Sequence, residues 1–363
     1  MIMSRPFSLR LMLLVLLSAS TVKAQADGFW RALKNWVDSA DIKGCDTTYL
    51  HLPKEGFVGY GNVYLTGTNA YLTYDQGTTD QGPVTVSGRL HTQVTTLFSA
   101  GISYRGWGLS YSKDLSKHGD TEWSFCSYGQ GYGLETRIHK STSLSGTLDV
   151  GFDGVEEGYK IRTKDSRHRL VLGNFYYVFG RKRFSLPAAM SHTIIQKRSS
   201  GSWLAILNYR HSSTTIDGNQ LRFFIAQKEL DAGTMGRVLF NRLSQTQVSL
   251  GGGYAHNFIF REGRFLLHFS AMPMLSVWHR NRSYYNTHVW NSDSGLMQDE
   301  KQSVAISQKL AINGTIHSSF VYNFSRYVTG VMAFANIDSF PEKEKFSLYT
   351  FDWSSRFFFG VRF

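Results

Sequence analysis

The chain is dominated by long segments in which apolar and polar side chains alternate. In the clearest one, residues 303–324, the even positions are mostly apolar and end in aromatic residues, whereas the odd positions are small, polar or cationic. Successive side chains of a β-strand point to opposite faces, so this pattern predicts one apolar and one polar face. Strands of globular proteins have about 5–6 residues, and an alternating segment of this length therefore indicates a strand that crosses a membrane.

The first residues have the layout of a secretory signal peptide. Arg5 and Arg10 precede a short apolar core at 11–17, and Val22 and Ala24 occupy the −3 and −1 positions of a cleavage site. The core is much shorter than the roughly 20 apolar residues of a membrane-spanning helix. We therefore expect cleavage after Ala24, which removes three basic residues and no acid and lowers the formal net charge from +12 to +9.

An exported chain whose apolar residues are spread through alternating segments is typical of an outer-membrane β-barrel. Aromatic residues make up 15% of the chain and only two residues are Cys, which argues against disorder and against a disulfide scaffold. We predict an all-β fold, a transmembrane antiparallel barrel of about twelve strands. The expected strands are 57–73, 91–104, 107–116, 121–128, 131–140, 168–179, 202–211, 245–259, 264–279, 303–324, 327–338 and 347–363.

The connections between these segments alternate in length. Short turns follow every second strand, and longer polar connections such as 141–167, 212–244 and 280–302 follow the others. Short periplasmic turns and long external loops are the usual asymmetry of such barrels, so we expect both termini in the periplasm. The predicted organisation is a signal peptide (1–24), a periplasmic segment with a short helix over 28–42 (25–56) and the barrel (57–363).

Three stretches of the chain carry a family resemblance. They are 46–49 with 52–54, then 176–179 with 183–191, 196–199 and 201–202, and finally 359–363. These stretches resemble a family of outer-membrane proteins, domain-of-unknown-function family 4421. The resemblance implies a barrel and an outer-membrane location, and it implies no activity because the family has none assigned.

Several cations fall on the predicted lumen face of the strands, namely Arg210, Lys309, Arg356 and Arg362. Rings of Arg or Lys favour anions in pores, so these residues predict an anion-preferring interior. Pairing with Asp or Glu of neighbouring strands is an equally open alternative. Two Cys in an oxidising compartment could also form one disulfide, Cys45 to Cys126, or remain thiols.

The connection at 180–201 is too long for a periplasmic turn. It carries Arg183, Pro187, Lys197 and Arg198 and no acidic residue. One interpretation is a periplasmic cap that binds an anionic partner. The other, which we favour, is a connection that folds into the barrel and closes its floor, because plugged lumens are common in barrels.

Catalytic and metal-binding motifs are weak in this sequence. Ser191 and His192 are adjacent, and neighbouring strand residues point to opposite faces. His268 and His317 share predicted lumen faces with Ser270 and Ser319, but no nucleophile elbow and no HExxH spacing appear. We therefore expect no cofactor or metal, and we favour a small-solute channel or binding barrel over a lipid-modifying enzyme or a structural membrane protein.

The expected partners follow from location and charge. Export and dispersed cations argue against nucleic acid. Cations in the presumed external loops would meet the phosphates of lipopolysaccharide, whereas the aromatic closing strand, ending in Phe363, resembles the signal read by the barrel-assembly machinery. The loop cations are Lys160, Arg280, Arg282 and Lys301.

Overall fold

The computed structural model describes residues 44–363 except 80–81, 116–118, 143, 153–154, 164–165, 216–241, 292–295, 307–309 and 342–345. The signal peptide, the helix expected over 28–42 and Lys309 therefore lie outside the described residues. Within the described part of the chain, no helix is long and apolar enough to cross a membrane.

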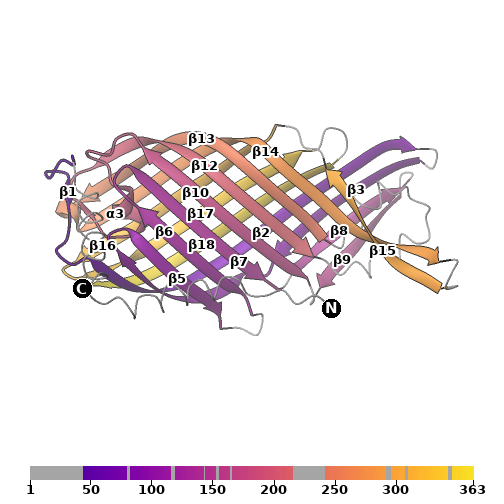
Figure 1. Ribbon diagram of the computed structural model, residues 1–363, viewed down its shortest axis with the longest axis horizontal. Helices are drawn as coiled ribbons and strands as arrows, with labels where there is room; N and C mark the ends of the chain where they lie inside the picture. Colours follow the sequence, from indigo (N-terminus) through magenta and orange to yellow (C-terminus); the bar gives the residue numbers. More distant parts are fainter. Residues whose placement is uncertain are drawn as a thin grey trace, which may run out of the picture. The chain divides into compact units, whose positions relative to one another are not determined.

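Twelve antiparallel strands form the barrel wall (Figure 1). Their order is β18-β17-β16-β14-β13-β12-β10-β7-β6-β5-β4-β2, and pairing of β18 with β2 closes the sheet. The bounds are β2 (Phe57–Thr79), β4 (Thr95–Tyr104), β5 (Trp107–Asp114), β6 (Thr121–Tyr128), β7 (Tyr132–Ser141), β10 (Arg167–Val178), β12 (Ser200–Thr215), β13 (Arg242–Phe260), β14 (Phe265–Asn291), β16 (Ile312–Phe324), β17 (Tyr327–Pro341) and β18 (Phe346–Arg362). The predicted twelve-stranded antiparallel barrel is confirmed.

The prediction of a single strand over 303–324 is wrong. The structure has two strands there, β15 (Leu296–Ile306) and β16. Both pair with the long β14, β16 with its first part and β15 with its last part. The alternating pattern runs through both strands, so it does not mark the point where the chain leaves the β14–β15 hairpin and enters the barrel wall.

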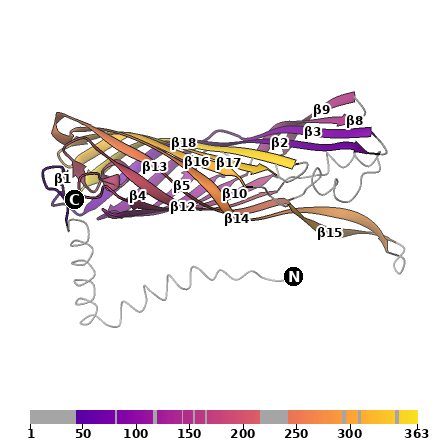
Figure 2. The same cartoon turned by 90° about the horizontal axis from the view of Figure 1, so that it is seen from above.

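Further strands extend one rim of the barrel. They are β3 (Gly82–Thr92), β8 (Leu144–Phe152) and β9 (Val155–Thr163), which continue the sheet outward from β2. Figures 1 and 2 both show them at the same end as β15. Most of these residues were predicted to lie in loops, although the sequences of β3 and β8 alternate apolar and polar residues. The strand predicted to start at residue 91 starts at Thr95.

The two faces of the strands have opposite chemistry, as predicted. On β16, Ile312 is 69% exposed and Phe320 45%, whereas Asn313 and His317 are each 3% exposed. The same contrast separates Phe357 (56%) from Asp352 (5%) and Arg362 (2%) on β18. An apolar outer surface in contact with hydrocarbon, around a lumen lined by polar groups, is the arrangement of a transmembrane barrel.

Short turns close the opposite end of the barrel, at 105–106, 129–131, 261–263 and 325–326. At Arg105 and Gly106 both residues have positive φ, 47° and 91°, as two-residue hairpin turns of the favoured type require. We call this the short-turn end, and the end with β3, β8, β9 and β15 the long-loop end. The backbones of Phe57 and Phe363 bond to each other at the short-turn end, with N–O distances of 3.2 and 3.0 Å.

Candidate functional site

A plug, residues 180–199, fills the short-turn end of the lumen. It contains α3 (Leu186–Met190) and the two-residue strand β11 (Ile195–Gln196), which pairs with β1 (Leu50–His51). Ser185 caps the helix, its hydroxyl accepting a hydrogen bond from the Ala188 amide at 3.2 Å, and Pro187 occupies the first turn, where it costs no hydrogen bond. Phe184 and Ala189 are completely buried.

Hydrogen bonds tie the plug to strands around the whole wall. The Asn257 amide on β13 donates to the Ser185 carbonyl at 2.9 Å, and the Ser319 hydroxyl on β16 donates to the Ala189 carbonyl at 3.1 Å. The Arg362 guanidinium on β18 donates twice to the His192 carbonyl, at 3.2 and 3.0 Å. A connection held by several strands at once acts as a fixed floor.

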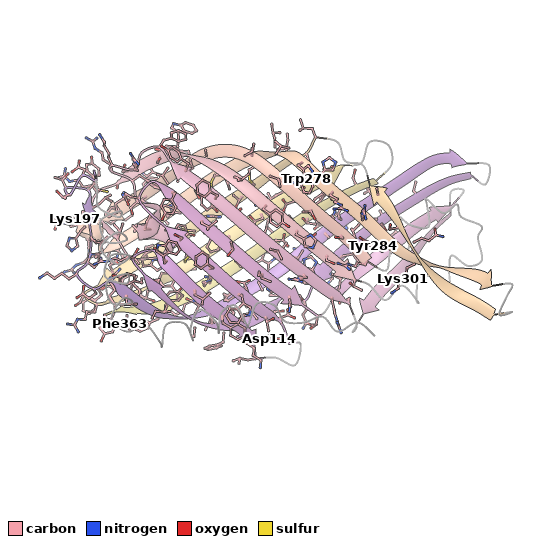
Figure 3. The ribbon with its side chains drawn as sticks, viewed as in Figure 1. Asp114, Lys197, Trp278, Tyr284, Lys301 and Phe363 are labelled. Carbon is pink, nitrogen blue, oxygen red and sulfur yellow. The ribbon has the colours of Figure 1, made fainter. Side chains whose placement is uncertain are left out.

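The outer face of the plug carries its exposed cations. Arg183 lies 3.6 Å from the Asp46 carboxylate, and Arg183 and Arg198 both approach the ring of Tyr49. Hydrogen bonds from Thr48, aided by the charge of Arg183, hold the pKa of Asp46 below its ordinary value of 3.8. Figure 3 labels Lys197 at this same end. The predicted cap residues thus face outward, apart from Pro187, which is buried.

A buried ion pair crosses the lumen in the middle of the barrel. Arg210 on β12 contacts the carboxylates of Asp338 on β17 and Asp352 on β18, at 2.7 and 2.5 Å. Its guanidinium also donates to the hydroxyl of Thr350 at 3.2 Å. Strands β12 and β18 are not neighbours in the sheet, so these contacts form a bar across the interior, which we call the crossbar.

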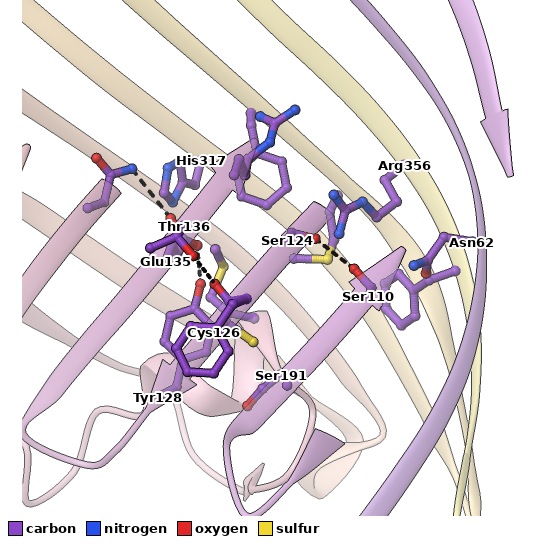
Figure 4. A pocket seen from close by; sticks show the side chains of 18 of the residues that line it. Asn62, Ser110, Ser124, Cys126, Tyr128, Glu135, Thr136, Ser191, His317 and Arg356 are labelled. Carbon is purple, nitrogen blue, oxygen red and sulfur yellow. Dashed lines mark hydrogen bonds between the residues drawn. The ribbon is translucent and has the colours of Figure 1, made fainter. Parts of the chain in front are cut away.

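A chamber of about 90 Å³ occupies the lumen on the plug side of the crossbar (Figure 4). Met190 and His192 of the plug line its floor. The lining at the other end includes Leu172, which pairs in register with Arg210, and Asn336, two residues before Asp338. The chamber therefore lies between the two closures of the lumen.

Opposite walls of the chamber carry opposite charges. On one wall the carboxylate of Glu135 accepts hydrogen bonds from the hydroxyls of Tyr128 and, at 2.7 Å, Tyr176. On the other, Arg356 lies over the rings of Tyr64 and Phe334 at 4.9 and 5.8 Å. Figure 4 shows Glu135 and Arg356 on separate strands of the chamber.

The cations predicted in the lumen differ in their burial and in their contacts. Arg210 and Arg362 are buried at 1% and 2% exposure and bonded as described above. Arg356 lines the chamber, and the nearest carboxylate oxygen given for it belongs to Glu122 at 3.8 Å. Lys309 lies outside the described residues. Pairing with Asp or Glu, the alternative that the sequence left open, is what the structure gives Arg210, but the two carboxylates lie across the lumen and not on neighbouring strands.

Most of the histidines and serines considered for catalysis have structural contacts, whereas the buried Ser270 hydroxyl has no hydrogen-bond partner among the described residues. His268 Nδ1 lies 2.7 Å from the Asn257 amide oxygen, and His317 Nε2 lies 3.0 Å from the Thr315 hydroxyl. The Ser319 hydroxyl is bonded to the plug, and the Ser191 hydroxyl contacts Thr193 at 3.0 Å. No group of three His, Cys, Asp or Glu suited to a metal occurs among the described residues.

The two cysteines are not joined in this structure. Cys126 lines the chamber, facing inward as its position on the strand predicts, whereas Cys45 adjoins Asp46, whose amide bonds to the plug at Lys182. Sequence reasoning missed the chamber residues Asn62, Glu135 and Glu122. Their places on the polar face could be found from the alternation, but their partners on distant strands could not.

The family model described as Domain of unknown function (DUF4421) matches residues 46–363. A comparison with curated proteins finds no match. Two solved structures are similar in fold, both at low identity. The outer membrane protease OmpT from Escherichia coli is 8% identical, over 88% of this chain and 100% of that one, with a TM-score of 0.35. The beta domain of the Bordetella autotransporter BrkA is 11% identical, over 85% and 100%, with a TM-score of 0.32.

Proposed function

Because this chain belongs to the DUF4421 family and folds as a barrel of the outer-membrane type, we propose that it is a barrel that binds a small solute in its lumen, closed as a pore in this conformation. The observation that carries the proposal is the chamber enclosed between plug and crossbar. An eight-stranded barrel is filled by its side chains and a sixteen-stranded one leaves a channel, so twelve strands with a partly filled lumen suit a binding chamber.

The crossbar argues for binding over free diffusion. An anion channel needs cations whose charge is available to the passing ion, but Arg210 is committed to two carboxylates and Arg362 to the plug. The contacts of Ser319 and His268 favour binding over catalysis in the same way, because a nucleophile needs a base within reach and freedom to react.

Planar-bilayer conductance of the purified protein tests this function. The wild type is expected to show no steady current. Replacing residues 181–199 by a short turn, together with Arg210→Met, Asp338→Asn and Asp352→Asn, should open the lumen, because it removes both the plug and the crossbar. Pairing of Val178 with Leu204 keeps β10 and β12 in register without the plug. The control is Lys197→Gln with Arg198→Gln, which removes charge outside the lumen and should stay silent. A wild-type protein with steady open-pore conductance would overturn the proposal.

We also propose an orientation for the barrel. Phe57 and Phe363 both lie at the short-turn end, which we place in the periplasm, so that the assembly machinery reads the strand ending in Phe363. The exposed Arg280, Arg282 and Lys301 would then meet phosphates of lipopolysaccharide (Figure 3 labels Lys301). A protease added to intact cells should cut a site inserted near Lys301 and spare one placed after Gly44, and the reverse pattern would refute this orientation.

A further inference from the structure

We infer that the chamber binds a small organic anion with an apolar body, whose acidic group is held by Asn62 and Arg356. The inference rests on the proposed function and names its ligand. Asn62 is 3% exposed, and its amide nitrogen and the Nε of Arg356 both lack a hydrogen-bond partner among the described residues. Both residues line the chamber (Figure 4). A buried donor without an acceptor is costly, so these two atoms point to a ligand that supplies oxygen acceptors.

The sheet register brings the two donors together. Asn62 on β2 is opposite Phe358 on β18, and Arg356 is opposite Tyr64. Asn62 and Arg356 are therefore diagonal neighbours on the lumen face, and such positions are roughly 7–8 Å apart. One carboxylate or similar group between them can accept a hydrogen bond from each.

The charges near Arg356 leave one positive charge without a close counterion. Glu122 lies 2.8 Å from Arg137 and 3.4 Å from His139, but 3.8 Å from Arg356. One carboxylate thus serves two guanidinium groups. Charge buried in a medium of low polarity is unfavourable unless it is paired, and a ligand with one negative charge at Arg356 would supply the missing partner.

The rest of the chamber determines the ligand's shape. Glu135 is already bonded by two tyrosine hydroxyls and repels an acidic group, which keeps that group on the wall of Arg356. Met190, Met332 and Phe334 offer an apolar lining, and methionine adapts to varied shapes. A cavity of roughly 150 Å³ holds one benzene ring, so about 90 Å³ suits a smaller ligand, a carboxylate with a short aliphatic chain such as propionate.

The test measures binding of three probes of equal shape and different charge to the full-length protein in lipid nanodiscs, by calorimetry. The probes are propionate, propionamide and propionamidine. Propionate is expected to bind most tightly and propionamidine most weakly. Arg356→Gln should weaken propionate at least about tenfold while changing propionamide little, and the exposed Arg264→Gln, which also removes one positive charge, should change neither. Heat-modifiable gel migration shows that each variant is folded.

The possible results distinguish a failure of the proposed ligand or site from a failure of the proposed function on which they rest. If propionamide or propionamidine binds and propionate does not, the anion assignment is wrong and the binding barrel stands. If Arg356→Gln leaves propionate affinity unchanged in a folded barrel, the site is wrong. If no probe binds and the wild type conducts as an open pore, both the ligand and the proposed function fail, and absence of propionate binding in a silent barrel overturns the ligand alone.

Discussion

Replacing Arg210 by Met would test whether the crossbar is a necessary part of the closed barrel. The side chain of Arg210 is 1% exposed, and those of Asp338 and Asp352 are 5% and 7% exposed. Met fills much of the same space but removes the only cation that the structure places against these two carboxylates within the described residues. The variant thus leaves two like charges buried on neighbouring strands.

The expected cost follows from burial. Removing one partner of a buried ion pair costs about 3–5 kcal/mol, whereas replacing the whole set by neutral groups is often neutral or stabilising. Arg210→Met should therefore destabilise the barrel by about 3–5 kcal/mol. The triple variant with Asp338→Asn and Asp352→Asn should recover most of this loss, because the amides carry no charge and the amide oxygen at position 352 can still accept the hydrogen bond of the Thr68 hydroxyl.

Urea unfolding of the protein in lipid vesicles, followed by tryptophan fluorescence, measures both free energies, and the gel shift of unboiled protein gives an independent midpoint. The denaturant slope should stay constant, because the surface exposed on unfolding is unchanged. Equal destabilisation in the single and triple variants would show that Arg210 acts through packing alone. No destabilisation in the single variant would refute the buried crossbar.

Three further predictions concern other parts of the molecule. Ile316→Arg, near the middle of the lipid face of β16, should cost about 2–4 kcal/mol in unfolding experiments, and Ile312→Arg at the end of that strand only about 0–1 kcal/mol; equal costs would contradict the assigned depth. Ser185→Ala should lose a helix cap, about 0.5–2 kcal/mol, and make the plug more sensitive to limited proteolysis, whereas Ser185→Asp should not. Because the pKa of Asp46 is lowered in the folded protein, the contribution of Asp46 to stability is complete above pH 3.8 and is lost as the pH falls through the lower folded pKa. An NMR titration of Asp46 in the wild type and in Arg183→Gln measures this pKa. A value at or above 3.8 in the wild type would contradict the prediction.

The sequence predicted the barrel well because the period-two pattern has a direct physical cause. Lipid outside and a polar lumen inside sort every strand by alternate residues, so Ile312 and Asn313 can be assigned to faces without knowing any neighbour. The rim strands were missed although their sequences also alternate, with Val84, Val86 and Leu90 at alternate positions of β3. Together β3, β8 and β9 contain only two aromatic residues, Phe152 and Tyr159, so the aromatic girdle that marks a membrane strand is nearly absent from them.

The interior could not be predicted in the same way, since its contacts join residues far apart in the chain. Arg362 bonds to the carbonyl of His192 across 170 residues, and Arg210 to Thr350 across 140. A sequence indicates that these side chains face inward, but only the sheet register decides which of them meet. The cations therefore looked like a lining for anions, although Arg210 is neutralised across the lumen.

The three stretches that carry the family resemblance converge on one place, although they are distant in sequence. The Asp46 amide bonds to the carbonyl of Lys182, and the Lys197 amide bonds to that of Tyr49, so the first stretch holds the second. Arg362, from the third stretch, bonds to the carbonyl of His192, which lies between two parts of the second. The three stretches thus build the floor of the barrel at the short-turn end. For the binding barrel proposed above, a fixed floor favours solutes that enter and leave through the long-loop end, past the crossbar, over passage through the barrel.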